Sequence, residues 1–368
     1  MGEIPKTCLA GVVVNEGPDF HIEVVDVPVP EPGPNEVLIK LNTTGLCMSD
    51  VHYMLNDLGV PSMSHFQTRS PGHEGAGVIV KVGSQVTSLK VGQRAGMKPT
   101  WDVCHSCESC RNGRENYCKG SISTGLQKPG SLIYFVIGTG SADGNTKGSY
   151  QQYVVSPERY TILIPEGVSD YVAGPVMCSA STMLHSLKTA NLSPGQWAVF
   201  IGGGGGVGLQ GVQLASAMGL RPIVVDTGEK RHELSRKYGA EHFVDFRETK
   251  DPVADVLALT DGGAHGVFVT AIQAYPFAIG YLGDRAGGKL MCIGIGPPNR
   301  HTITLDPTAS NFMLRNQSVT STIVSSLGEI ALALDFARRG KLHLDPEVVG
   351  VSQWNDSVQK LKNGQVAG

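Results

Sequence analysis

Short apolar runs separated by proline and glycine dominate the first part of the chain. They cover residues 11–14, 23–27, 36–41 and 77–82, and runs of this length bounded by turn residues are typical of strands. Turn-forming residues are densest at 28–34, where the sequence reads Pro-Val-Pro-Glu-Pro-Gly-Pro. The pattern predicts an all-β, partly barrel-like unit.

The pattern changes at residue 196, where apolar strands begin to alternate with helical patterns. Regular β-α-β alternation is typical of a parallel, doubly wound sheet with helices on both faces. The predicted strands are 197–201, 222–226, 243–245, 266–270 and 289–293, and the predicted helices between them are 207–218, 229–238 and 253–259. Two later helices are predicted at 327–339, which ends before a glycine, and at 357–362.

Length and composition favour two domains over one. A chain of 368 residues, 41% of them hydrophobic, is too long for one core and apolar enough to fill two. We therefore predict an α/β protein that joins a β-rich domain to a doubly wound parallel-sheet domain. A net charge of −3 gives no reason to expect a nucleic acid or an anionic membrane as a partner.

Nothing in the sequence suggests export or membrane insertion. No apolar run approaches the roughly 20 residues that a membrane-spanning helix needs. The residues directly after Met1 (Gly-Glu-Ile-Pro-Lys) lack the apolar core of a signal peptide. We therefore expect a soluble protein of the reducing cytoplasm.

Four cysteines lie close together in one short stretch, with the spacing C-x2-C-x2-C-x7-C. They are Cys104, Cys107, Cys110 and Cys118. Four thiolates at this spacing can complete a tetrahedral shell around one Zn²⁺, and a complete shell leaves no position for a substrate. We predict a structural zinc ion here. Disulfides are the alternative, and a reducing compartment disfavours them.

A second set of candidate ligands and titratable groups lies outside the four-cysteine loop. It consists of Cys47, Ser49, Asp50 and His52 in residues 45–52, His73 and Glu74 in residues 71–78, and Cys178. A lone cysteine or histidine is more often a buried structural side chain. Two cysteines and one histidine in a chain that already carries a zinc loop nevertheless match a three-ligand site with a vacant fourth position. We leave Cys8 and Cys292 as structural thiols.

A glycine-rich loop follows the first strand of the doubly wound domain. Residues 201–208 contain G-x-G-x-x-G as Gly203, Gly205 and Gly208, so the backbone can approach a pyrophosphate at the N-terminus of the next helix. The following strand ends in Asp226, at about the 20-residue distance that the dinucleotide fingerprint requires. A carboxylate there binds the ribose hydroxyls and repels a 2′-phosphate, which favours NAD over NADP.

Four further residues belong to the predicted cofactor site or border it. Gly206 and Val207 complete the loop, and Lys230 is assigned as a contact just beyond Asp226. Lys230 and Arg231 could soften the preference for NAD, although solvation on the helix surface is the alternative role for both.

The zinc and cofactor sites together predict the oxidation of an alcohol. Zinc is a Lewis acid that lowers the pKa of an alcohol, and a nicotinamide accepts hydride from the alcohol carbon. Ser49 is placed to take the alcohol proton and to pass it through the ribose to His52. We expect Asp50 to orient the ring of His73. For Glu74 we expect either an approach to the metal during ligand exchange or a buried salt bridge.

As an ordered set, these motifs resemble those of the zinc-dependent medium-chain alcohol dehydrogenase family, and most of all its yeast-type and fungal cytosolic members. The resemblance covers nearly the whole chain and is carried by residues 45–52, 72–79, 104–118 and 176–180 and by the glycine loop with Asp226. It implies a GroES-like catalytic domain that is split in sequence around an inserted Rossmann domain. The implied boundaries are 1–179, 180–320 and 321–368. Relatives of this type are dimers or tetramers, which implies a homo-oligomer, most simply a homotetramer.

The resemblance also implies roles for individual residues. Two zinc ions per chain are expected, a structural one in the four-cysteine loop and a catalytic one held by Cys47, His73 and Cys178. Ser49 and His52 match the proton relay of the family. Ile295, which follows the strand predicted at 289–293, is expected near the nicotinamide and the substrate.

Two stretches depart from the family pattern. Residues 131–147 resemble an insertion between the zinc loop and the next strand. At 99–101 the chain reads Pro-Thr-Trp, where yeast-type enzymes place a bulky tryptophan directly after the preceding lysine. This difference predicts a larger substrate pocket.

Three alternatives remain beside an NAD-dependent alcohol dehydrogenase that acts on primary or secondary alcohols. An NADP-preferring aldehyde reductase of the same superfamily is disfavoured by Asp226. A polyol dehydrogenase is disfavoured because that branch often replaces the second cysteine ligand, here Cys178, with a carboxylate. A non-catalytic, zinc-stabilised dinucleotide-binding protein would leave the second ligand set unexplained.

Overall fold

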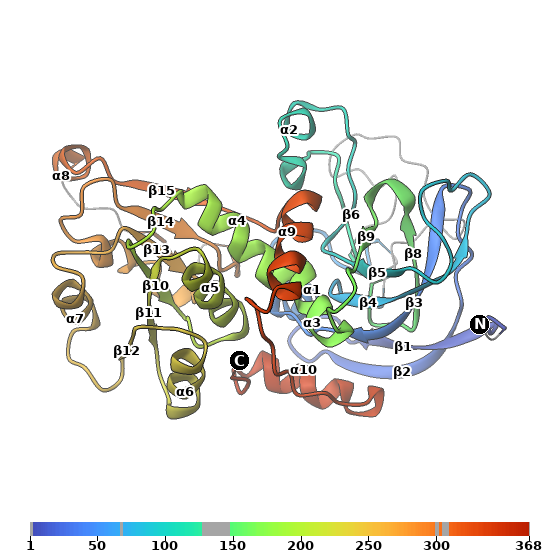
Figure 1. The fold of residues 1–368 in the computed structure, drawn as a ribbon. Helices are drawn as coiled ribbons and strands as arrows, with labels where there is room; N and C mark the ends of the chain where they lie inside the picture. Colours follow the sequence, from blue (N-terminus) through green and yellow to red (C-terminus); the bar gives the residue numbers. More distant parts are fainter. Residues whose placement is uncertain (1–2, 67–68, 127–147, 299–301, 304–308, 368) are drawn as a thin grey trace. The chain divides into compact units, whose positions relative to one another are not determined.

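The computed structural model describes residues 3–66, 69–126, 148–298, 302–303 and 309–367 (Figure 1). The predicted insertion at 131–147 therefore lies outside the described residues. The chain divides into two compact units. Unit 1 consists of Met1–Cys178, Val324–Arg338 and Leu344–Gln365, and unit 2 of Ser179–Ile323, Arg339–His343 and Val366–Gly368.

Unit 1 is built on antiparallel sheets. The five-stranded sheet has the order β8-β3-β4-β5-β9, formed by β3 (Glu36–Thr44), β4 (Gly75–Val82), β5 (Arg94–Met97), β8 (Tyr153–Pro157) and β9 (Ile162–Leu163). Two-stranded sheets are formed by β1 (Thr7–Val14) with β2 (His21–Pro28), and by β6 (Thr100–Asp102) with β7 (Ile122–Ser123). Successive residues of β3 enter different cores, with Val37 and Ile39 in one and Leu38 in another. Because side chains alternate across a strand, this sheet is covered on both faces.

Short helices surround the sheets of unit 1. They are α1 (Met48–Leu55), α2 (Glu108–Arg111), α3 (Asp170–Pro175), α9 (Leu327–Arg338) and α10 (Trp354–Lys362), with 3₁₀ turns η1 (Glu115–Tyr117), η2 (Glu158–Tyr160) and η6 (Val351–Gln353). A π-helical turn, η3 (Val176–Ala180), directly follows α3. Helix α10 packs on α1 and β2, where Trp354 and Val358 share one core with Met54 and Ile22. Helix α10, near the end of the sequence, thus completes a core that also contains residues of the first two strands.

Unit 2 contains a six-stranded, fully parallel sheet. Its order is β12-β11-β10-β13-β14-β15, from β10 (Trp197–Ile201), β11 (Arg221–Asp226), β12 (His242–Asp245), β13 (Gly266–Val269), β14 (Lys289–Cys292) and β15 (Ser318–Ser321). Counted from β10, this is the order 3-2-1-4-5-6 of the dinucleotide-binding fold, in which ligands bind beyond the carboxyl ends of the strands where the order reverses.

The helices of unit 2 connect these parallel strands. They are α4 (Ser181–Ala190), α5 (Gly206–Ala217), α6 (Glu229–Lys237), α7 (Pro252–Leu259) and α8 (Ala309–Leu314), with 3₁₀ turns η4 (Ile272–Ala274) and η5 (Ala278–Leu282). All five residues of β10 are buried, which explains its continuous apolar sequence, since both faces of a parallel sheet are covered.

The predicted fold class is confirmed, with an antiparallel β-rich unit and a parallel doubly wound unit (Figure 1). Several elements begin elsewhere than the sequence pattern placed them. Helix α10 begins at Trp354 rather than at residue 357, because the tryptophan is itself one of its buried anchors. Among the described residues, no helix is both long enough and apolar enough to span a membrane.

Candidate metal centres and cofactor loop

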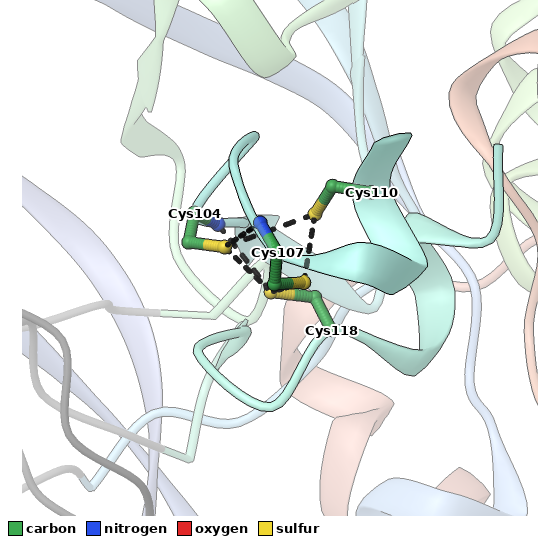
Figure 2. Close-up of side chains that lie close together, drawn as sticks. All are labelled: Cys104, Cys107, Cys110 and Cys118. Atoms are coloured by element: carbon green, nitrogen blue, oxygen red, sulfur yellow. Dashed lines mark hydrogen bonds between the residues drawn. The ribbon is translucent and has the colours of Figure 1, made fainter. Parts of the chain in front are cut away.

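The four-cysteine loop brings its sulfur atoms together around one point (Figure 2). Cys107 is the N-cap of α2, Cys110 lies within α2, Cys118 follows η1, and Cys104 precedes the other three. The Sγ atom of Cys104 lies 3.4 Å from that of Cys118 and 3.9 Å from that of Cys110. The Sγ atom of Cys107 lies 3.6 Å from that of Cys110 and 3.8 Å from that of Cys118. All four thiols are free.

These separations fit a zinc ion and do not fit disulfides. Four sulfurs placed tetrahedrally at the Zn–S distance of about 2.3 Å lie about 3.8 Å apart, whereas bonded sulfurs lie about 2.05 Å apart. Backbone N–H groups of Cys107 and Gly120 donate to the sulfurs of Cys104 and Cys118 at 3.3 Å each. Against the effect of burial, the amides of Ser106 and Cys107 lower the pKa of Cys104 to about 6. Thiolates, the form that binds zinc, are favoured at this position.

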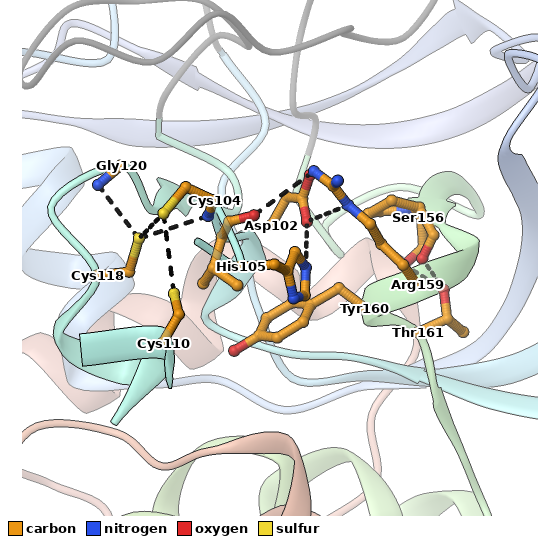
Figure 3. A network of polar contacts seen from close by, with 12 residues as sticks. Asp102, Cys104, His105, Cys110, Cys118, Gly120, Ser156, Arg159, Tyr160 and Thr161 are labelled. Carbon is orange, nitrogen blue, oxygen red and sulfur yellow. Dashed lines mark hydrogen bonds and ion pairs between the residues drawn. The ribbon is translucent and has the colours of Figure 1, made fainter. Parts of the chain in front are cut away.

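A polar network fastens the four-cysteine loop to the rest of unit 1 (Figure 3). Asp102, at the end of β6, accepts a hydrogen bond of 3.2 Å from Nε of Arg159 in η2. Its Oδ1 atom also lies 3.5 Å from Nε2 of His105. His105 has a φ of 56°, and its ring lies edge-on to Tyr160 with the ring centroids 5.7 Å apart. The loop therefore has anchors in addition to its metal-binding side chains.

A second cluster of donors, the open-site cluster, consists of Cys47, His73, Glu74 and Cys178. One donor atom from each lies within 4.8 Å of the others. Cys47 is the N-cap of α1, His73 and Glu74 precede β4, and Cys178 lies in the π-helical turn η3. A donor set this compact fits one Zn²⁺, whose nitrogen and sulfur ligands lie about 2.0–2.3 Å from the metal. π-helical turns of this kind frequently occur at functional sites.

Glycine at position 45 leaves the room that Glu74 occupies. A Cβ atom added to Gly45 would lie 2.0 Å from Oε2 and 3.0 Å from Cβ of Glu74, so the Glu74 side chain would have to move. The backbone N–H of Gly45 also donates to the carbonyl oxygen of Glu74 at 2.9 Å. The missing side chain at Gly45 and this backbone hydrogen bond therefore allow the Glu74 carboxylate to lie among the candidate metal ligands.

Asp50 fixes the orientation of His73. Its Oδ1 atom accepts hydrogen bonds from Nδ1 of His73 at 2.8 Å and from the backbone N–H of Gly72 at 3.0 Å, and Asp50 is fully buried. Because Nδ1 carries this proton, Nε2 of His73 keeps its lone pair for a metal. The Oδ2 atom of Asp50 is buried with no hydrogen-bond partner among the described residues.

Burial and nearby charges shift the pKa values within the open-site cluster. A hydrogen bond with the Cys178 thiol holds the pKa of Cys47 well below its usual value, against the effect of burial. Burial, together with the charge of Cys47, raises the pKa of Glu74 well above its usual value. Cys47 is therefore the member best able to carry the negative charge with which a cysteine binds metal.

Ser49 and His52 lie three residues apart on α1 and therefore share one face of that helix. Ser49 is half-buried, and His52 is buried. The Nδ1 atom of His52 pairs with Oδ1 of Asp57 at 2.8 Å. Sequence reasoning missed Asp57, because it lies beyond the end of a short helix that no apolar period predicted.

The glycine loop of unit 2 needs glycine for two physical reasons. Gly202 has a φ of +80°, in the left-handed region that favours glycine. A Cβ atom on Gly208 would lie 2.4 Å from Cα of Gly203, so the first turn of α5 can approach the end of β10 only without a side chain there. Gly205 is the N-cap of α5, and Gly206 and Val207 form its first turn. Free N–H groups at such a helix start suit a pyrophosphate.

Asp226 lies at the carboxyl end of β11 and is already paired. It accepts hydrogen bonds of 2.9 Å from the backbone N–H of Gly204 and 2.8 Å from that of Thr227. Nη1 of Arg231 lies 2.9 Å from its Oδ1 atom. Lys230, in contrast, is exposed. The structure thus places Arg231, and not Lys230, beside the predicted ribose-binding carboxylate.

Ile295 lies just beyond the carboxyl end of β14 and is 47% exposed. An exposed isoleucine at the ligand-binding edge of a parallel sheet can contact a bound planar group. Cys8 is buried in the core of unit 1, and the pKa of Cys292 is raised to about 11 by burial. Neither thiol belongs to a metal-binding cluster among the described residues.

Comparison with known proteins agrees with both units. The family profile for the alcohol dehydrogenase GroES-like domain matches residues 33–166, and the profile for zinc-binding dehydrogenases matches residues 206–339. Alcohol dehydrogenase 1 of Neurospora crassa is 33% identical over 373 aligned residues, which cover 100% of this chain and 97% of that protein.

Two solved structures share the fold over nearly their whole length. Benzyl alcohol dehydrogenase from Acinetobacter calcoaceticus has a TM-score of 0.82 at 24% identity, covering 99% of this chain and 98% of its own. Acetophenone reductase from Geotrichum candidum, solved in complex with NAD, has a TM-score of 0.79 at 25% identity, covering 99% and 96%. Fold and metal-binding side chains together define a zinc-type oxidoreductase. More particularly, the chain belongs to the zinc-dependent medium-chain alcohol dehydrogenase family.

Proposed function

We propose that this protein is an NAD-dependent alcohol dehydrogenase that interconverts a primary or secondary alcohol and its aldehyde or ketone. The open-site cluster carries the proposal, because Cys47, His73 and Cys178 offer two sulfurs and one nitrogen within 4.8 Å of one another. Three protein ligands are typical of catalytic zinc sites, which keep a position for substrate. Bound there, zinc would supply a Lewis acid that lowers the pKa of an alcohol.

The residues in and around the open-site cluster orient a metal ligand, transfer the alcohol proton and supply a further donor in this reaction. Asp50 holds Nε2 of His73 toward the metal position through the 2.8 Å hydrogen bond to Nδ1. Ser49 takes the hydroxyl proton of the alcohol, and His52 on the same face of α1 receives it. Glu74, buried within the cluster and with a raised pKa, offers a fourth donor that can replace a departing ligand.

For the cofactor, we propose NAD bound to the glycine loop of unit 2. NAD would supply the hydride acceptor for the alcohol carbon. Gly203, Gly205 and Gly208 permit the pyrophosphate to approach the start of α5, and Asp226 accepts hydrogen bonds from ribose hydroxyls. Ile295 lies beside the nicotinamide in this proposal. The four-cysteine loop holds a second, structural zinc ion, and we retain the sequence-based predictions of a cytoplasmic homotetramer.

The test is NADH formation with a graded panel of primary and secondary alcohols. We expect turnover with NAD⁺, loss of turnover in Cys47→Ala, and retention of turnover in the matched control Cys292→Ala, which removes a thiol outside both clusters. Zinc content, measured on each variant, should fall by one equivalent in Cys47→Ala only. Wild-type protein that holds zinc and oxidises no alcohol would refute the proposed function.

A second candidate is an NADP-preferring reductase of the same family. The ion pair between Arg231 and Asp226 favours it, because the guanidinium reduces the repulsion that Asp226 exerts on a 2′-phosphate. The same assay distinguishes the two, since this candidate requires a higher kcat/KM with NADP than with NAD.

A further inference from the structure

The proposed reaction releases one proton for each alcohol oxidised, and His52 is poorly placed to release it to water. His52 is only 5% exposed. Among the described residues, its hydrogen-bond partner is Asp57, whose Oδ1 atom lies 2.8 Å from Nδ1 of His52. A proton that reaches the ring at Nε2 therefore meets one polar neighbour, and that neighbour is a carboxylate.

The backbone at the end of α1 places Asp57 beside His52. Asn56 ends the helix in the left-handed conformation, with a φ of 53°, and the N–H of Asp57 turns back to the carbonyl oxygen of His52 at 3.4 Å. This turn brings the carboxylate of Asp57 within hydrogen-bonding distance of Nδ1 of His52. The side chain of Asp57 is 28% exposed, against 6% for that of His52. Asp57 is therefore the more exposed member of this pair.

We propose that Asp57 carries the proton from His52 to solvent, and that it also positions the ring that receives this proton. The inference rests on the proposed function. When Nε2 of His52 gains a proton, the N–H bond at Nδ1 breaks and Oδ1 of Asp57 gains that proton. The carboxylic acid then releases that proton to water. The ring returns to its starting form by exchange with water, in which Nε2 loses one proton and Nδ1 gains one. One proton enters and one leaves, and no electrons are transferred to either residue.

A purely structural role for Asp57 is the competing interpretation, since a carboxylate at a helix end also stabilises the turn. Asp57→Asn separates the two. The amide oxygen still accepts the hydrogen bond from Nδ1 of His52, so the ring keeps its orientation, but an amide cannot accept the proton. A structural role predicts little change in this variant, whereas a role in proton release predicts a specific delay.

The experiment follows hydride and proton in the same stopped-flow reaction, with alcohol and NAD⁺ in weak buffer. NADH absorbance reports the hydride, and a soluble pH indicator reports the proton. In wild type we expect the two signals to rise together. In Asp57→Asn we expect proton release to lag and to slow by about tenfold, with the KM for NAD⁺ unchanged. Small carboxylate buffers should restore the rate, and Asp57→Glu should retain most of it.

Two controls make the result decisive. Asp19→Asn removes one exposed carboxylate elsewhere on unit 1, and it should release its proton as wild type does. His52→Ala should be slow already, and adding Asp57→Asn should slow it no further, because the two residues act in series. Proton release in step with NADH in Asp57→Asn would overturn the inference. Wild-type protein that forms no NADH would refute the proposed function, and the inference would fail with it.

Discussion

Asp226 has partners that act in opposite directions on the choice of cofactor. The amides of Gly204 and Thr227 hold its carboxylate at the edge of the sheet, where it can bind ribose hydroxyls. Arg231, 2.9 Å away, supplies a compensating positive charge that a 2′-phosphate could use. We therefore expect the ratio of activity with NAD to activity with NADP to depend on both side chains.

We predict that Arg231→Ala raises the ratio of kcat/KM for NAD to kcat/KM for NADP by about tenfold. The uncompensated Asp226 then repels the 2′-phosphate, while the two amides still hold its carboxylate for ribose. Steady-state kinetics with both cofactors provide the measurement. Arg236→Ala is the matched control, because Arg236 lies on the same helix and bonds the carbonyl oxygen of Glu241 instead. An equal loss with both cofactors would contradict the prediction.

Lys98 is a buried cation whose protonation couples to folding. It is 3% exposed, its Nζ atom donates to the carbonyl oxygen of Tyr160, and it lies 4.0 Å from the centroid of that ring. Burial lowers the pKa of Lys98 to about 7, although the charge of Asp102 opposes the shift. An unfolded lysine titrates at a pKa of about 10.4, so between these two values the unfolded chain binds more protons than the folded chain.

From this difference we predict that stability rises with pH between the two pKa values of Lys98. The slope contributed by Lys98 is at most about 1.4 kcal/mol per pH unit. Lys98→Met should remove that contribution, and urea unfolding at both ends of the window measures it. Lys90→Met, which removes an exposed lysine of the same unit, should leave the slope unchanged. Parallel pH profiles for wild type and Lys98→Met would count against the prediction.

At the scale of the element, we expect the four-cysteine loop to depend on a bound zinc ion for much of its stability. Helix α2 has only four residues and buries none of them, so no helical core supports the loop. Its sulfur separations of 3.4–3.9 Å match one tetrahedral zinc shell. Metal binding to a small loop contributes directly to its folding free energy.

We predict that Cys110→Ser removes one zinc equivalent and lowers the Tm by about 5 °C. Limited proteolysis should then cut within residues 104–118, while the glycine loop of unit 2 continues to bind NAD. Zinc content, thermal unfolding and mass spectrometry of the fragments provide the measurements. Cys8→Ser, at a buried thiol outside both clusters, could also lower the Tm but should retain both zinc ions. A variant Cys110→Ser that keeps both ions would show that the loop holds its metal in another way.

The elements that the sequence predicted well are those with strong periodicity. β10 is a continuous apolar run, β11 and β14 each contain a shorter one, and α5 begins at a glycine motif, so their places follow from local pattern. Helix α1 was not predicted as a helix, because its eight residues carry polar chemistry rather than an apolar period. Strand β15 was also missed, because Ser318–Ser321 is only four residues long and partly polar.

At the scale of the whole molecule, sequence motifs indicated the candidate metal ligands but not the residues that surround them. Spacing placed the four cysteines in one loop because they are neighbours in the chain. The pairs His52–Asp57 and Asp226–Arg231 depend on how the chain turns after a helix or a strand, which composition does not determine. The approach of Cys178 to Cys47 depends on tertiary packing of residues 131 positions apart in the chain, and no spacing rule could predict it.

Helix α10 has a consequence for how the protein is made. The side-chain oxygen of Asn355 accepts a hydrogen bond from the backbone N–H of Ile22, 333 positions earlier. The ring of Trp354 packs against that of Tyr150 at a tilt of 39°, with the ring centroids 5.0 Å apart. A ribosome delivers the early strands long before this helix. All strands of the unit 2 sheet have been synthesised by residue 321. The core of unit 1 that contains Ile22 and Met54, in contrast, cannot be completed until α10 has been synthesised. The nascent chain therefore carries an unfinished apolar surface during most of its synthesis.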